Sequence, residues 1–100
     1  MSKSRIQRKD GTCFICSRIY NDFWEKTVEE HHIFGGPDRK KCERDGLKVY
    51  LCIPHHRTSE SAAHVSPITA AYLHAVGQAA YEEAGHTREE FRQRYGKSYL

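Results

Sequence analysis

Four thiol and imidazole side chains fall into two pairs with the same internal spacing. Two residues separate Cys13 from Cys16, and two residues separate Cys52 from His55. This gap lets both side chains of a knuckle reach one ion, and two such half-sites complete the tetrahedral shell of a structural zinc. Residues 17–51 lie between the pairs, which is more than a plain zinc ribbon needs and leaves room for a hairpin. We expect a structural Zn²⁺ here rather than ordinary buried cysteines beside a surface histidine.

A second group of histidines, His31, His32 and His56, suits hydrolysis of a phosphodiester. Neighbouring residues on a strand point to opposite sides. In-line attack likewise places the incoming water and the leaving oxygen on opposite sides of phosphorus. One histidine can therefore face a metal that stabilises the leaving oxygen, while its neighbour faces the water as general base. The pair alone is equally typical of a solvated strand end, but two metal knuckles and His56 frame it.

The elements that position these groups follow from periodicity and turn residues. Alternation over residues 27–34 predicts a strand ended by the Gly-Gly-Pro-Asp turn, residues 39–46 predict a polar, basic loop, and residues 47–52 predict a second strand. These elements form a hairpin with a long loop that leads into the second knuckle. Cys42 lies in that loop without a partner at ligand spacing and is predicted to be a free thiol.

The C-terminal third is predicted to be helical. Ser66 and Pro67 form an N-cap and first-turn pair, and the alanine-rich stretch that follows runs to Ala84 before Gly85. Leu73, Val76, Ala80 and Ala84 fall on one face of this helix. Thr87 to Glu90 is a capping box that opens a second helix, which Gly96 closes.

Length and composition favour one small intracellular domain. The chain has 100 residues, of which 38% are hydrophobic and 29% charged, so its core alone gives marginal stability. We expect a flexible basic N-terminal arm over residues 1–10 and one folded domain over residues 11–100. The polar start has no signal peptide, and no apolar run could span a membrane. These features predict a cytoplasmic protein of a bacterium or phage-infected host, in which paired cysteines bind metal.

The motifs together resemble the HNH, or ββα-metal, endonuclease superfamily. The resemblance lies in residues 30–33 (Glu-His-His-Ile), the hairpin, and residues 51–57 (Leu-Cys-Ile-Pro-His-His-Arg). It is closest to small phage and prophage members akin to the recombination-enhancement, RecA-dependent nuclease, and it extends from Cys13 to the end of the chain. It implies an α+β fold with a zinc-stapled ββα-metal core and C-terminal helices, and a metal-dependent DNA endonuclease activity that nicks or cleaves both strands.

The resemblance assigns roles to individual residues. His32 matches the general base, His31 the metal ligand before it, and His56 the last histidine of the motif, also a metal ligand. These three form the expected catalytic site, with one catalytic divalent metal such as Mg²⁺, Mn²⁺, Ni²⁺ or Zn²⁺. His55 stands where many members have a second cysteine, so the structural zinc site becomes Cys₃His.

Two positions remain open. The middle asparagine of the motif is absent from residues 44–49, where Asp45 is the nearest substitute. His64, eight residues past His56, is either a third ligand of the catalytic metal or a loop histidine before the Ser66 cap.

Basic residues predict DNA as the partner. The expected loop and second strand carry Arg39, Lys40, Lys41, Arg44 and Lys48. Phosphate contacts of this kind bind without sequence preference, and no recognition helix stands out. A recombination or packaging protein is a further expected partner. The main alternative is a non-catalytic zinc module that binds nucleic acid or protein, and another is a structural phage protein. Such proteins would have no use for His31, His32 and His56 together.

Overall fold

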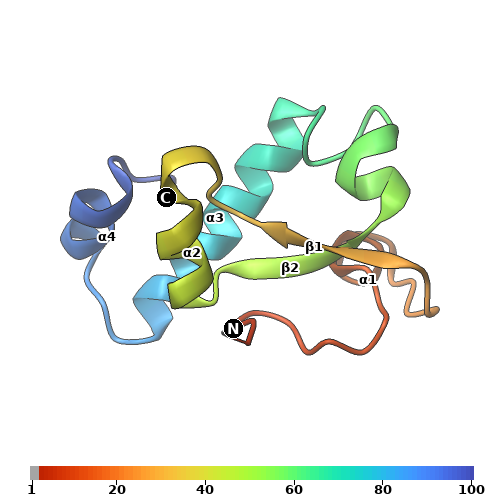
Figure 1. Ribbon diagram of the computed structural model, residues 1–100, viewed down its shortest axis with the longest axis horizontal. Coiled ribbons are helices and arrows are strands. Elements are labelled where there is room, and N and C mark those ends of the chain that lie inside the picture. The colour runs from red at the N-terminus through yellow and green to blue at the C-terminus, as the bar shows by residue number, and fades with distance from the viewer. Residues whose placement is uncertain (1–2) are drawn as a thin grey trace.

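A two-stranded antiparallel sheet lies at the centre of the computed structural model, which describes residues 3–100 (Figure 1). Strand β1 (Val28–His32) pairs with β2 (Lys48–Cys52), and His31 lies opposite Val49 while His32 lies opposite Lys48. Residues directly opposite each other share a face of the sheet, and neighbours along a strand do not. The register therefore separates the two neighbouring histidines onto opposite faces.

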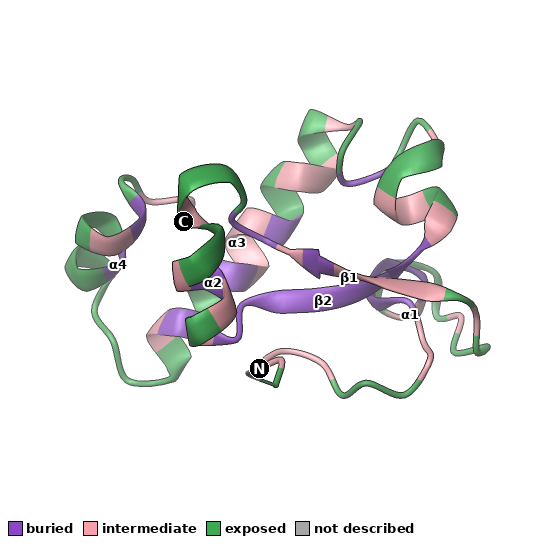
Figure 2. Cartoon of the chain, in the orientation of Figure 1, coloured by how far each residue is buried: buried purple, intermediate pink, exposed green. Residues whose placement is uncertain are grey.

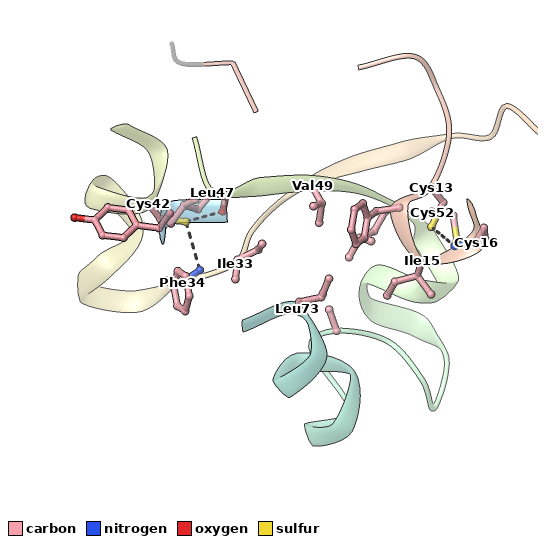
Figure 3. Close-up of a cluster of buried hydrophobic side chains, with 14 of the residues drawn as sticks. Cys13, Ile15, Cys16, Ile33, Phe34, Cys42, Leu47, Val49, Cys52 and Leu73 are labelled. Atoms are coloured by element: carbon pink, nitrogen blue, oxygen red, sulfur yellow. Dashed lines mark hydrogen bonds between the residues drawn. The ribbon is translucent and has the colours of Figure 1, made fainter. Parts of the chain in front are cut away.

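The segment between the strands is helical, which corrects the predicted loop over residues 39–46. A short turn, η1 (Gly36–Asp38), leads into α2 (Arg39–Asp45). Pro37 lies in the first turn of η1, and Gly46 ends α2 at φ 71°, where a glycine is favoured. The buried Cys42 thiol donates a hydrogen bond to the Leu47 carbonyl at 2.9 Å and so holds the end of α2 close to β2 (Figure 3).

Both predicted C-terminal helices are present. Helix α3 (Pro67–Glu83) begins at Ser66, whose side chain accepts a hydrogen bond from the Thr69 amide. Helix α4 (Arg88–Tyr95) begins with the predicted capping box and ends at Gly96. The expected packing face of α3 is only partly confirmed, because Leu73 is buried while Ala84 is exposed.

Helix α3 packs closely against the chain that follows β1, at Gly77. A Cβ atom on Gly77 would lie 2.9 Å from the ring of Phe34 and 3.0 Å from the side chain of Ile33. The absence of a side chain at Gly77 therefore lets α3 approach the chain just after β1. Strand β2 is buried along its whole length (Figure 2), and Val49 and Leu73 pack into the same core (Figure 3).

Residues of the expected N-terminal arm lie along β2. The Arg5 amide donates to the Gly46 carbonyl at 2.8 Å, and the Tyr50 amide donates to the Gln7 side chain at 2.8 Å. Ile6 also packs against the core. The segment thus satisfies backbone groups at the edge of β2, including the Lys48 carbonyl, which accepts a hydrogen bond from the Ser4 hydroxyl. Lys48 itself is 1% exposed. Residues 1–2 of the expected arm lie outside the described part of the chain.

The architecture is α+β, as the sequence predicted, with one two-stranded sheet and helices around it. Among residues 3–100, no helix combines the length and apolar character needed to cross a bilayer.

Candidate metal centres

Cys13, Cys16, Cys52 and His55 lie together, as their spacing predicted. His55 Nδ1 is 3.3 Å from the sulfurs of Cys16 and Cys52 and 3.8 Å from that of Cys13, and the Cys16 and Cys52 sulfurs are 3.8 Å apart. Zinc with ordinary bond lengths and tetrahedral angles requires ligand separations of about 3.6 Å between nitrogen and sulfur and about 3.8 Å between sulfurs. The cluster therefore has the dimensions of a tetrahedral zinc site.

Short-range structure holds these ligands in place. Helix α1 (Phe14–Tyr20), which the sequence analysis missed, begins at Cys13, and the Cys16 amide donates to the Cys13 sulfur at 3.4 Å. Cys52 ends β2, and His55 lies in the helical turn η2 (Pro54–Thr58). The Tyr20 ring stacks on His55 with centroids 5.7 Å apart. The three cysteines gather at one end of the core (Figure 3).

Burial shifts the pKa values of three of the four residues in this cluster. Burial and the neighbouring Cys13 thiol raise the pKa of Cys16 to about 12, and burial also raises the pKa of Cys52. Burial lowers the pKa of His55, which favours the neutral imidazole that binds metal. A divalent cation would offset the cost of ionising the buried thiols. The Cys₃His cluster is thus compatible with structural zinc.

His31, His56 and His64 form a second cluster on the α3 side of the sheet. Each offers a ring nitrogen, and these atoms lie within 4.8 Å of one another, with the Nε2 atoms of His56 and His64 3.0 Å apart. Two imidazoles on adjacent positions of one ion have nitrogens about 2.9–3.4 Å apart for bonds near 2.1 Å. His31 comes from β1, His56 from η2 and His64 from the turn before α3, where the His64 amide donates to the His56 carbonyl.

Glu29, which the sequence analysis did not single out, supports His56 from behind. Its carboxylate accepts a hydrogen bond from His56 Nδ1 at 2.8 Å and two from Arg57 at 2.9 and 3.2 Å. These bonds, first that of Arg57 and then that of His56, lower the pKa of Glu29 to about 2. An ionised carboxylate can only accept, so Nδ1 carries the proton and the Nε2 lone pair faces the cluster. A carboxylate behind a ligating histidine is a common feature of metal sites.

Burial favours the neutral form of two members of this cluster, His31 and His64. Burial, and secondarily the nearby His64 and His56, lower the pKa of His31 to about 3. Burial and His56 lower the pKa of His64 as well. A neutral imidazole is the form that ligates a metal. The arrangement can hold a divalent cation with three nitrogen ligands and leave further coordination positions open.

His32 lies on the opposite face, away from this cluster. Its Nε2 is 2.7 Å from Glu43 of α2, and the buried Lys48 ammonium is 3.0 Å from the same carboxylate oxygen. A hollow of about 620 Å³ borders His32. It is lined by Glu30, His32, Gly36, Arg39, Lys40, Glu43 and Arg44.

The expected DNA-binding residues divide into two groups. Arg39, Lys40 and Arg44, here called the α2 basic patch, are exposed at the rim of the hollow. Lys41 instead pairs with Asp38 at 2.9 Å, and Lys48 is buried among carboxylates. Of these five residues, only those of the α2 basic patch are exposed at the hollow, so the expected phosphate contacts narrow to these three.

Asp45 does not line this hollow and instead connects two helices. Its carboxylate accepts hydrogen bonds from Arg94 at 2.6 and 3.0 Å and from the Tyr95 hydroxyl at 2.6 Å, which joins α2 to α4. Burial and the Asp45 contact raise the pKa of Tyr95. The Cys42 thiol also accepts a hydrogen bond from the Phe34 amide at 3.4 Å, which links α2 to the chain just after β1.

The structure thus brings together the two predicted sets of metal-ligating residues and places His32 apart from both, on the other face of β1. Comparison with protein-family models, curated proteins and solved structures finds no match to this chain.

Proposed function

We propose that this protein is a metal-dependent DNA endonuclease of the HNH, or ββα-metal, type, with a structural zinc as its staple. The observation that carries the proposal is the arrangement of side chains around β1. A three-histidine cluster faces one side of this strand, and the neighbouring His32 faces the other side, beside a basic rim. In-line hydrolysis of a phosphodiester needs stabilisation of the leaving oxygen and activation of the water on opposite sides of phosphorus, and this division of side chains supports the proposal.

The residues present fit a catalytic divalent metal. His31, His56 and His64 would hold it, because their ring nitrogens converge and Glu29 fixes the proton of His56 on the far nitrogen. Such an ion stabilises negative charge on the leaving oxygen. Three protein ligands with open positions are typical of catalytic sites, whereas the four ligands of the Cys₃His cluster are typical of structural ones.

His32 acts as general base in this proposal. In a two-stranded sheet β1 has one unpaired edge, where its two faces meet. A phosphate at that edge could meet a metal held by His31, His56 and His64 on one side and a water near His32 on the other. The α2 basic patch supports this placement, since its positive charge lies at the rim of the hollow that His32 borders. Contacts to phosphates alone imply binding to DNA without sequence preference.

The test is plasmid nicking with Mg²⁺, Mn²⁺, Ni²⁺ or Zn²⁺ by the wild type, His32→Ala, His31→Ala and a control, His86→Ala. His86 is 44% exposed on a segment remote in sequence from both clusters. We expect nicking by the wild type and the control. Loss of the base should cost about 10²–10⁴-fold in rate without loss of metal binding. His31→Ala should instead weaken metal binding.

Absence of nicking by the wild type with every metal would overturn the nuclease proposal. The non-catalytic zinc module would then be the better explanation. Its supporting observation is a set of exposed apolar side chains beside the Cys₃His cluster: Ile19, Tyr20, Phe23 and Trp24.

A further inference from the structure

The two ring nitrogens of His32 have different surroundings. Nε2 lies 2.7 Å from Oε1 of Glu43 and 3.6 Å from Oε1 of Glu30, so two carboxylates face it. Within residues 3–100, no hydrogen bond is made to Nδ1. A carboxylate beside Nε2 accepts its proton-bearing N–H and stabilises that tautomer, which leaves the lone pair on Nδ1.

Lys48 holds the carboxylates of Glu43 and Glu30 in place. Its ammonium is 3.0 and 3.1 Å from the two oxygens of Glu43 and 3.2 Å from Glu30. Although burial opposes the charged form, the bonds to Glu43 and Glu30 raise the pKa of Lys48, so the ammonium keeps its proton. A charged group buried to 1% exposure is costly unless it is paired. The pairing ties β1, α2 and β2 together around the His32 ring.

We infer that Glu43, held by Lys48, is a positioning residue for His32 that keeps the proton on Nε2 and presents Nδ1 as the base. This inference rests on the proposed nuclease function. In the chemical step, a proton moves from the attacking water to Nδ1 while the water oxygen bonds to phosphorus. The P–O bond on the opposite side breaks, its oxygen takes a proton from solvent water, and the imidazolium then gives its proton to the hydroxide that remains. The resulting imidazolium would be stabilised by Glu43, as in other carboxylate–histidine pairs.

The first test reads the tautomer directly and needs no activity. Long-range ¹H–¹⁵N correlation spectra of the zinc-bound protein, recorded at a pH where the imidazoles are neutral, distinguish Nε2–H from Nδ1–H. The signal of His32 is assigned from its loss in His32→Gln. We expect Nε2–H in the wild type and in the exposed control Glu83→Ala, and a mixed population in Glu43→Ala. Glu43→Gln, which keeps the side-chain volume, should shift in the same direction but less.

The second test is kinetic. Glu43→Ala should lower kcat by about tenfold or more, with KM for DNA and affinity for the catalytic metal unchanged, because only the base is misaligned. Glu83→Ala should match the wild type. An Nδ1–H tautomer in the wild type, or an unchanged tautomer in both Glu43 variants, would overturn the inference even if the protein cleaves DNA. An Nε2–H tautomer that depends on Glu43 in a protein without nicking activity would overturn the nuclease proposal alone.

Discussion

Removing the carboxylate behind His56 should weaken the proposed catalytic metal site without touching a ligand. Glu29 accepts from His56 Nδ1 at 2.8 Å, and this bond orients the ring and assigns its tautomer. Loss of such an outer partner typically costs about 10–100-fold in metal affinity, which corresponds to about 1.4–2.7 kcal/mol. We expect the loss of metal affinity to lie near the lower end of this range for Glu29→Gln, which keeps an acceptor oxygen, and near the upper end for Glu29→Ala.

Isothermal titration calorimetry with Mn²⁺ or Ni²⁺ on zinc-bound protein measures this affinity. Glu30→Gln is a matched control, because Glu30 is the next residue on β1 but faces the opposite side of the sheet. Arg57→Met should cause a smaller loss than Glu29→Ala, since Arg57 contacts Glu29 and not the His56 ring. Equal metal affinity for Glu29→Ala and the wild type would refute the reasoning. So would an equal loss in Glu30→Gln.

Three further predictions concern the zinc site, pH and DNA. Chelation of the zinc, or Cys52→Ser, should unfold the domain in circular dichroism, because a structural site is coupled to folding; a folded, metal-free protein would contradict this. The depressed pKa of His31, about 3 in the fold against 6.5, means that the unfolded chain binds more protons, so stability falls as pH drops below 6.5. Between pH 6.5 and 5 the shifted pKa of His31 should lower the free energy of unfolding by about 2 kcal/mol. Urea titrations should find this pH dependence reduced in His31→Leu. Charge reversal of the α2 basic patch should weaken DNA binding and flatten its salt dependence in fluorescence anisotropy, while reversal of the exposed Arg92 on α4 should not.

The features predicted from sequence depend on residues a few positions apart. The two knuckles have complete ligand pairs at fixed spacing, and Ser66 and Thr87 cap helices through amides three residues ahead. Alternation over β1 separates His31 from His32 whatever the rest of the fold does. The missed helix α2 also had local signals in Pro37 and Gly46, but its run of charged residues was interpreted as a loop.

The groups that complete each site were decided by tertiary structure. Glu29 reaches His56 across 27 positions of sequence, and Glu43 reaches His32 across 11, because the hairpin register and α2 bring them together. Lys48 was expected on the DNA-binding surface, yet it is buried and its charge is paired with Glu43 and Glu30. Residue type and spacing determine which side chains can ligate or accept a proton. Their partners, burial and pKa depend on contacts between distant segments, which no local pattern encodes.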